Sequence, residues 1–368
     1  MKNVYLQYSN EYKNVEAPVL VTVVRTTGST PQKAGSSALF GASGLIAGTI
    51  GGGILEGQVM EIAIMAGKSK KSGLYTFRLD NSHDEGEDAL CGGRTDVLVD
   101  ASPCNHLDVF KCMQDSLTNG ISGIMVTRMT GLCGDDMDEI TVNRHWISSG
   151  THKCEKSWIS ESLFRTVRDV IEKDDRYDCR LSEHNEAEND IRSLVFIEQV
   201  FPKPKLIIAG AGHVGKALSG LGQMLDFEVT VIDDRPEFAN KLNISGADKF
   251  IVDDPGKALS GIEKNPDCYF VIVTRGHKDD ASALRPCIGS GAAYVGMIGS
   301  RTKVAKMREE FISKGWATEQ QWAEIYAPIG LEIGSRTVEE IAVSIAAQLV
   351  DVRSRKNKSD RGKRPENL

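Results

Sequence analysis

Three glycines stand in a spacing that suits the binding of a phosphate. Gly210, Gly212 and Gly215 follow the apolar run 206–209 in the pattern G-x-G-x-x-G. Glycines at these positions permit a tight turn, close approach of the backbone to a phosphate, and close packing of a helix on a strand. A helix is expected from 216 to 225, and its free N–H groups and dipole favour an anion at the loop.

Two aspartates complete this unit. The expected strand 228–232 ends in Asp233 and Asp234, and Arg235 follows them. A carboxylate at this distance accepts hydrogen bonds from a ribose 2′-OH, so Asp233 favours NAD over NADP, whereas Arg235 could reverse this preference. Strand, glycine loop, helix, strand and acid together predict a Rossmann domain that binds a dinucleotide. The alternative is a Rossmann fold that kept its loop for packing and binds no nucleotide.

Polar side chains follow the later strands of this half, which are expected at 249–252, 268–274, 293–298 and 324–327. Alternation of strands and helices predicts right-handed crossovers and a parallel sheet. Ligands of such sheets bind at the carboxyl ends of the strands. The expected ligand contacts in these segments are His277, Ser300 and Arg301, and His213 in the first glycine loop is expected to join them.

The two histidines have two interpretations. In the usual strand order the first and fourth strands are neighbours, which would place His213 and His277 on opposite lips of the ligand crevice. With Asp280 they could perform acid–base chemistry, with His277 as the catalytic residue, or bind a metal, although we predict no metal site. Alternatively, His213 caps the phosphate loop and His277 hydrogen-bonds a carbonyl.

A second glycine loop lies in the first half of the chain. Gly51, Gly52 and Gly53 stand directly before the helical pattern 54–66, which carries Glu56. A helix start of this kind favours an anion, so these four residues are expected ligand contacts. The alternative is a flexible turn.

Cys91 is a candidate for thiol chemistry. It follows the acidic run 83–88 and precedes Gly92, Gly93 and Arg94. The glycines leave the sulfur reachable and Arg94 favours the thiolate, whereas the acidic residues oppose it. The alternative is a small buried cysteine with a packing role.

Composition restricts the classes of protein that fit. The chain has 368 residues, 40% hydrophobic and 26% charged, with a formal net charge of −7. These values are typical of a two-domain globular protein and argue against nucleic-acid binding. No apolar run could span a bilayer, and the N-terminus lacks the apolar core of a signal peptide. A cytoplasmic protein with reduced cysteines is therefore expected.

We expect an α/β protein of two domains. An N-terminal α/β domain with a mixed sheet would span residues 1–201, and a Rossmann-type, doubly wound parallel sheet would span 202–352, after a stiff Pro-Lys-Pro segment. Within the first domain the polar stretch 174–190 is expected to be an exposed excursion. The basic tail 353–368 is expected to be disordered.

Taken together, these motifs resemble the XdhC/CoxI family of xanthine dehydrogenase accessory proteins. In the first half the similarity lies in RTTGSTP (25–31), GTIGGG (48–53) with Glu56, and CGG (91–93). In the second half it lies in GAGHVG (210–215), VIDDR (231–235), TRGH (274–277), YVGMIGSR (294–301), PIGL (328–331) and EIAVSI (340–345).

The resemblance implies a protein that binds molybdenum cofactor, assists its sulfuration and inserts it into a xanthine dehydrogenase-type molybdenum hydroxylase. Such a protein is a chaperone rather than an enzyme, and its partners would be the apo-hydroxylase and a cysteine desulfurase; we also expect a homodimer. In this interpretation Cys91 serves the sulfuration step. Two alternatives stay open: an NAD(P)-dependent oxidoreductase with His277 as proton donor, and a nucleotide-sensing regulatory module. The Rossmann crevice would hold NAD(P) or the nucleotide part of a dinucleotide molybdenum cofactor.

Overall fold

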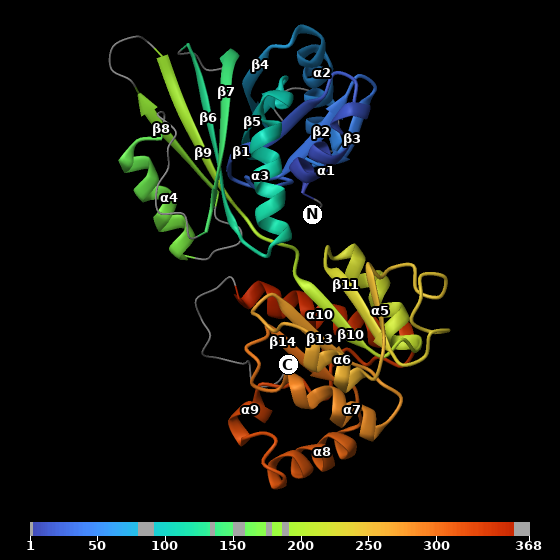
Figure 1. Ribbon diagram of the computed structural model, residues 1–368. Helices are drawn as coiled ribbons and strands as arrows, with labels where there is room; N and C mark the ends of the chain where they lie inside the picture. Colours follow the sequence, from blue (N-terminus) through green and yellow to red (C-terminus); the bar gives the residue numbers. More distant parts are fainter. Residues whose placement is uncertain are drawn as a thin grey trace. The chain divides into compact units, whose positions relative to one another are not determined.

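Two separate sheets organise the chain (Figure 1). The computed structural model describes residues 3–79, 92–132, 137–149, 159–173, 179–185 and 191–356. The chain divides into two compact units, Met1–Pro202 and Lys203–Leu368, and each has its own sheet and apolar core. The predicted α/β class, with a doubly wound parallel sheet in the second unit, is confirmed.

The first unit is built on a nine-stranded sheet in the order β3-β2-β1-β5-β4-β7-β6-β9-β8. Its described strand pairs run antiparallel, and short connections join neighbours such as β2 and β3. The strands are β1 Val19–Thr27, β2 Ser37–Gly41, β3 Gly44–Gly48, β4 Ser72–Arg78, β5 Arg94–Asp100, β6 Gly123–Leu132, β7 Met137–Ser148, β8 Cys179–Asn185 and β9 Ile191–Val200.

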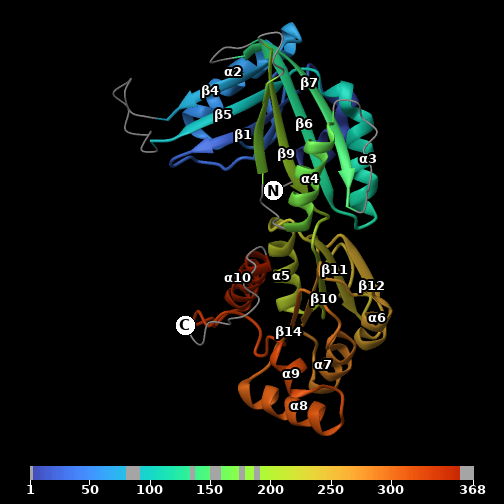
Figure 2. The ribbon, with the colours of Figure 1, turned by 90° about the vertical axis from the view of Figure 1, so that its left-hand side faces the viewer.

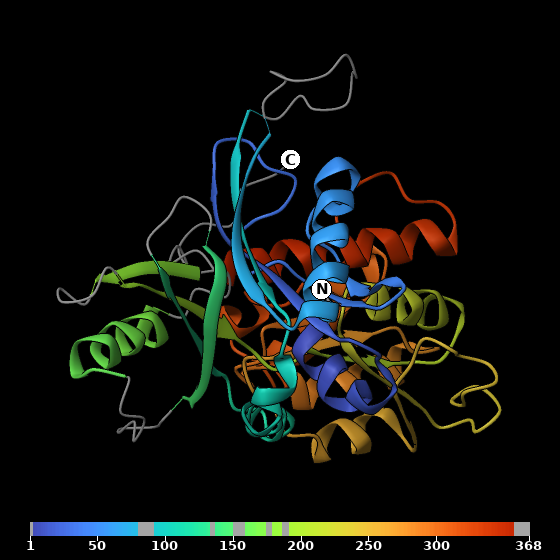
Figure 3. The ribbon, with the colours of Figure 1, turned by 90° about the horizontal axis from the view of Figure 1, so that it is seen from above.

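Helices cover both faces of this sheet. Helix α2 (Gly53–Ser69) buries Leu55, Val59 and Ala63 against β1, β2 and β5. Helices α1 (Val4–Glu11) and α3 (Leu107–Thr118) pack on the other face, where Leu20 and Leu39 are buried. Helix α4 (Glu161–Lys173) covers β6 and β9, far from α2 (Figure 3). Two 3-10 turns, Tyr12–Asn14 and Pro103–His106, complete the unit.

One strand of the first unit overturns an expectation. The sequence predicts an exposed excursion at 174–190, but β8 lies within this stretch and pairs with β9 at the edge of the sheet. An edge strand needs only one apolar face, and here Cys179 and Leu181 supply it against the core. Residues 174–178 and 186–190 lie outside the described part of the chain.

A buried polar cluster crosses the core of the first unit. The Tyr5 hydroxyl donates to Glu198 Oε2 at 2.7 Å, and Arg144 forms an ion pair with Asp100. Burial raises the pKa of the Glu198 carboxyl to about 7, against the opposing effects of the Tyr5 hydrogen bond and the Arg144 charge. This carboxyl therefore changes charge near neutral pH.

The second unit has a parallel five-stranded sheet in the order β12-β11-β10-β13-β14. Numbered along the chain this is 3-2-1-4-5, the beginning of the Rossmann order. The expected strand 324–327 forms only a single bridge, between Tyr326 and Gly296. The strands are β10 Lys205–Ala209, β11 Glu228–Asp233, β12 Lys249–Val252, β13 Cys268–Ile272 and β14 Tyr294–Met297.

Helices lie on both faces of this sheet as well (Figure 2). Helices α5 (His213–Met224) and α10 (Val338–Lys356) pack on one face, with Leu218 and Leu349 buried. The other face carries α6 (Pro255–Gly261), α7 (His277–Leu284), α8 (Arg301–Ser313) and α9 (Glu319–Ala323), with the turn Arg285–Cys287 after α7. None of the described helices is both long and apolar enough to cross a membrane.

The last helix continues beyond the predicted domain end. The sequence predicts a disordered tail from residue 353, but α10 is helical to Lys356. Arg353 donates to the carbonyl of Leu225 at 2.9 Å and lies over the Phe227 ring, 5.0 Å from its centroid. These contacts explain the error, because they hold a basic residue in the folded unit. Residues 357–368 lie outside the described part.

Candidate functional site

The three glycines of the predicted phosphate loop have different surroundings. A Cβ atom at Gly210, whose φ is +121°, would lie 2.3 Å from the carbonyl oxygen of Val273. At Gly215 it would lie 2.0 Å from the carbonyl oxygen of Gly210, so both positions require glycine for packing. At Gly212, the N-cap of α5, it would meet no atom within 4 Å. The middle glycine thus faces open space at a helix N-terminus, where a phosphate can approach the backbone.

That open space belongs to a cavity of about 320 Å³ at the carboxyl ends of β10, β11 and β13. This volume lies at the lower end of the range for small-molecule pockets. Six of the predicted contacts line the cavity: Gly210, Gly212, His213, Asp233, Asp234 and Arg235. It is also lined by Val214, Asp254, Pro255, Val273, Thr274, Arg275, Asp279, Ile298 and Val338.

Asp233 is nearly buried and already has four donors. Its oxygens accept from the backbone N–H of Ala211 at 2.8 Å and from the backbone N–H, Nε and Nη2 of Arg235 at 3.1, 2.8 and 3.1 Å. Burial alone raises the pKa of this carboxyl, but the hydrogen bonds from Arg235 and Ala211 outweigh it and lower the pKa to about 2. The carboxylate therefore holds the glycine loop, and a ribose hydroxyl would have to compete with these donors for the same two oxygens.

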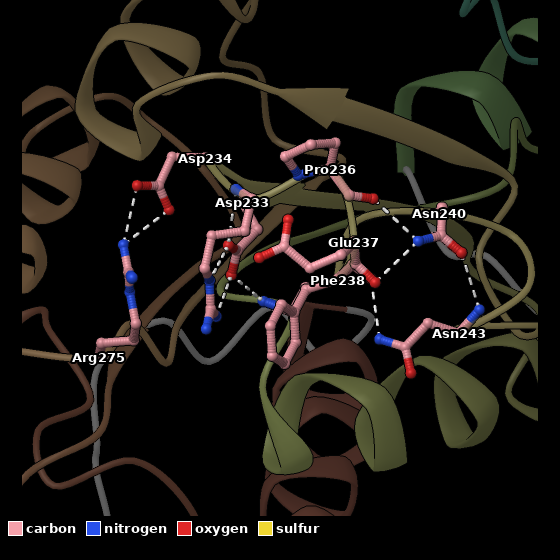
Figure 4. Close-up of polar contacts among 10 residues, drawn as sticks. Asp233, Asp234, Pro236, Glu237, Phe238, Asn240, Asn243 and Arg275 are labelled. Carbon is pink, nitrogen blue, oxygen red and sulfur yellow. Dashed lines mark hydrogen bonds and ion pairs between the residues drawn. The ribbon is translucent and has the colours of Figure 1, made fainter.

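Asp234 is the exposed acid of the pair. Its two oxygens each accept a hydrogen bond from Nη2 of Arg275 at 2.8 Å. Figure 4 draws both contacts as dashed lines. The side chains are 47% and 52% exposed, so water surrounds much of this ion pair. Arg275 follows β13 and is not among the predicted contacts. The position of Arg275 directly after a strand of the parallel sheet could have identified it as a ligand contact. Its ion pair could not be predicted from local sequence, because Asp234 lies 41 residues earlier in the chain.

Hydrogen bonds within residues 236–243, the segment after β11, hold the backbone next to Arg235 in one conformation. Asn240 Nδ2 donates to the carbonyls of Pro236 and Glu237 at 2.9 Å, and Asn243 Nδ2 donates to that of Phe238 at 2.9 Å (Figure 4). The Arg235 guanidinium lies 3.7 Å from the centroid of the Phe238 ring. Three amide hydrogen bonds and this stacking contact therefore fix the segment that positions Arg235.

His277, Ser300 and Arg301 are not among the described residues that line the cavity. His277 begins α7, and its Nε2 lies 3.3 Å from Glu310 Oε2. The Ser300 hydroxyl caps α8 by accepting from the N–H of Lys303 at 3.2 Å. Arg301 pairs with Glu332 on the surface. The predicted strand neighbours β10 and β13 are confirmed, but His277 does not form the second lip of this cavity.

In the first unit, Glu56 folds back over its own glycine loop. Its Oε2 accepts from the Thr49 hydroxyl at 2.8 Å and from the N–H groups of Ile50 and Gly52 at 3.1 and 3.3 Å. The carboxylate thus occupies part of the position that the sequence assigned to a ligand anion. A Cβ at Gly52 or Gly53 would meet no atom within 4 Å, so space remains beside the loop.

The motifs of the first unit come together in space. A Cβ at Gly28 would lie 2.9 Å from the carbonyl oxygen of Gly92, and one at Gly51 would lie 2.9 Å from Cβ of Pro31. The loop 28–31 therefore touches both other motif loops. Cys91 and the acidic run 83–88 lie outside the described residues.

Arg94 is already engaged beside that junction. Its Nε lies 3.2 Å from Asp96 Oδ1, and Arg25 Nε lies 2.8 Å from Asp96 Oδ2. The Asp96 side chain is only 3% exposed, so two arginines share one buried carboxylate. Among the described residues, no group of three or more His, Cys, Asp or Glu side chains is arranged to hold a metal ion.

Comparisons with known proteins find a match in each of the two units. The family model "XdhC and CoxI family" matches residues 13–78, and the model "XdhC Rossmann domain" matches residues 206–349. The chain is 26% identical over 357 residues to a probable xanthine dehydrogenase subunit of Bacillus subtilis (strain 168), an alignment that covers 96% of this chain and 99% of the relative. It is 32% identical over 161 residues to the uncharacterized protein YqeB of Escherichia coli (strain K12), which covers 44% of this chain and 29% of that protein.

A solved structure shares the whole fold. The crystal structure of a xanthine dehydrogenase from Bacillus halodurans superposes with a TM-score of 0.76 at 24% identity, covering 97% of this chain and 98% of the other. A model of the XdhC family matches part of each unit. The alignment with the Bacillus subtilis relative covers nearly the full length of both proteins. The chain therefore belongs to the XdhC and CoxI family.

Proposed function

We propose that this protein is an accessory protein of a xanthine dehydrogenase-type molybdenum hydroxylase. It binds molybdenum cofactor, assists its sulfuration together with a cysteine desulfurase, and transfers it to the apo-hydroxylase. Family membership supports the accessory role, and a relative aligned along its full length is described as a probable xanthine dehydrogenase subunit.

The observation that carries the binding proposal is the open N-terminus of α5 at Gly212. A phosphate of the cofactor fits there, because the position has no neighbour within 4 Å and belongs to a cavity of about 320 Å³. The backbone N–H groups at the start of α5 would hold the phosphate, with His213 and Arg275 beside it. The bound cofactor supplies molybdenum chemistry to the hydroxylase, while this chain supplies binding and orientation.

The oxidoreductase alternative relied on His277 as proton donor. That side chain contacts Glu310 and does not line the cavity, so this alternative loses its catalytic residue. A nucleotide-sensing module uses the same Gly212 position and is separated from the chaperone by experiment. Its signature is binding of a nucleotide without bound pterin.

The test is anaerobic purification of the full chain from cells that make molybdenum cofactor. Bound pterin is measured by fluorescence after oxidation, and molybdenum by mass spectrometry. We expect both in the wild-type protein, and we expect Gly212→Val to lose them because its side chain fills the phosphate position.

Gly220→Val is the matched control. Gly220 lies on the same helix, and a Cβ there also meets no atom within 4 Å, but it does not line the cavity. Retention of pterin by a folded Gly212→Val protein would move the site elsewhere. Absence of pterin and molybdenum from the wild-type protein would refute the cofactor-binding role.

A further inference from the structure

The Asp234–Arg275 ion pair connects the two sides of the glycine loop. Asp234 directly follows β11 and Arg275 follows β13, and these are the two strands that flank β10. The glycine loop leaves the sheet at the end of β10, between them. Both side chains line the cavity, as Gly212 does. A ligand phosphate at the loop would therefore lie beside this ion pair.

The charges around the cavity favour an arginine that can turn to an anionic ligand. Four carboxylates and two guanidinium groups belong to its described lining: Asp233, Asp234, Asp254, Asp279, Arg235 and Arg275. These six groups together carry two more negative than positive charges. This excess repels a phosphate, and an arginine that turns from its carboxylate to the phosphate offsets the repulsion, in addition to the N–H groups at the start of α5.

Only one of the two arginines is positioned to do so. Arg235 holds the nearly buried Asp233 through three hydrogen bonds and stacks on Phe238, and its side chain is 22% exposed. Arg275 binds Asp234 through a single nitrogen, and its side chain is 52% exposed. The other guanidinium nitrogens of Arg275 do not contribute to this ion pair, and a guanidinium can bind a phosphate through two parallel hydrogen bonds.

We propose that Arg275 is the phosphate-recognising side chain of this cavity, and that Asp234 competes with the ligand for it. This inference rests on the proposed function, because it takes the cavity as a phosphate-binding site. The shared ligand chemistry is a phosphate ester or anhydride on a nucleoside- or pterin-sized group. Binding exchanges one partner of Arg275 for another: the Asp234 carboxylate is released to water as the phosphate takes its place.

The exchange requires little free energy, since an exposed ion pair contributes about two- to fivefold to an equilibrium constant at low salt. Asp234→Asn keeps the shape of the side chain and removes its charge. It is therefore expected to tighten phosphate-ligand binding by about two- to fivefold. Arg275→Gln is expected to weaken it at least about tenfold, because it removes a charged donor of the phosphate.

The experiment is calorimetric titration of the full chain at low salt with ADP, NAD, adenosine and inorganic pyrophosphate. Adenosine carries the ribose without phosphate, so its affinity is expected to be the same in the wild type and both variants. Pyrophosphate tests whether phosphate alone is sufficient, and NAD tests whether a dinucleotide is preferred to ADP. Glu319→Gln is the matched control, because the Arg308–Glu319 pair is similarly exposed (52% and 62%) but does not line the cavity.

A double variant separates competition from simple repulsion. If Asp234 acts through Arg275, the gain from Asp234→Asn falls by more than half in the Arg275→Gln background. An unchanged gain in that background would overturn the proposal. So would a loss of both ADP and adenosine affinity in Asp234→Asn, because it would make Asp234 the ribose acceptor. If the wild-type protein binds neither ADP, NAD nor pyrophosphate, the phosphate site itself is refuted. If the wild-type protein binds one of these ligands but Asp234→Asn does not raise the affinity, only the role of Asp234 and Arg275 is refuted.

Discussion

Two arginine–aspartate pairs on consecutive aspartates make a controlled comparison of buried and exposed charge. Arg235 pairs with Asp233, whose side chain is 5% exposed, and Arg275 pairs with Asp234, whose side chain is 47% exposed. We predict that Arg235→Gln destabilises the second unit strongly, whereas Arg275→Gln barely changes its stability. The chemical change is the same in both variants, so the difference reports burial.

The magnitude follows from the pKa of Asp233. Its folded value is about 2, against about 3.9 in an unfolded chain. At about 1.4 kcal/mol for each pH unit, this difference stabilises the folded state by about 2 to 3 kcal/mol at neutral pH. Arg235→Gln removes the guanidinium charge and two of the four donors, and it leaves the two backbone N–H groups, so we expect a loss of about 2 kcal/mol. For Arg275→Gln we expect less than about 1 kcal/mol.

The sign of the pH dependence is fixed by the lowered pKa. The stabilisation is complete above the unfolded pKa of about 4 and is lost as the pH falls through about 2, where the folded carboxyl takes up its proton. The difference in unfolding free energy between wild type and Arg235→Gln is therefore expected to fall to about half its neutral value near pH 3.

The assay is urea unfolding of the full chain at about pH 7 and pH 3. Hydrogen exchange of peptides from 205–215 and 228–235 shows which unfolding transition belongs to the second unit. Equal destabilisation by the two arginine substitutions would refute the role of burial. A difference that stays constant between the two pH values would show that Asp233 does not carry it.

Three further results are expected. Gly210→Ala should destabilise the second unit by about 3 kcal/mol or more, because Gly210 has a φ of +121° and a Cβ there would lie 2.3 Å from a carbonyl oxygen. Gly212→Ala should change the stability by no more than about 0.5 kcal/mol, because a Cβ there meets no atom within 4 Å. Thermal unfolding of both variants checks this. Glu56→Ala removes an oxygen that accepts three hydrogen bonds and should cost about 1 to 2 kcal/mol in the first unit, seen as faster hydrogen exchange at residues 49–56. Glu198→Gln should leave the stability of the first unit unchanged below about pH 4 and raise it by about 3 kcal/mol above about pH 7. The reason is that ionisation of a buried carboxyl with a pKa of about 7 destabilises the folded state. Melting curves at about pH 5 and pH 8.5 test the sign.

Elements with a strong local pattern could be predicted from the sequence. The apolar run of β10, the glycine spacing and the start of α10 all act over a few residues. At α10 the Thr337 hydroxyl accepts from the N–H of Glu340 at 3.2 Å, and the Glu340 carboxylate accepts from the N–H of Thr337 at 3.0 Å, which is the reciprocal arrangement of a capping box. Strand β8 was missed because its polar sequence is suited to an edge, where only one face is buried.

The candidate site was predictable only where its residues are close in sequence. The glycine loop and the acids after β11 were found in this way. The ion pair between Asp234 and Arg275 requires the strand order, which places the ends of β11 and β13 on either side of β10. Ser300 illustrates the opposite error, because its position after a strand is equally suited to an N-cap, and that is the role it has.

The hydrogen bonds that hold the glycine loop have a consequence for the thermodynamics of ligand binding. The N–H of Ala211 is fixed by Asp233, and the N–H of Gly210 donates to the carbonyl of Ile232 at 2.8 Å. The backbone that leads into the proposed phosphate site is therefore held in place without a ligand. Little conformational entropy remains to be lost there on binding, so a calorimetric titration should show only a small unfavourable entropy from this loop. If the proposed phosphate site is correct, affinity at this end of the cavity depends on the phosphate and its solvation, rather than on the ordering of the chain.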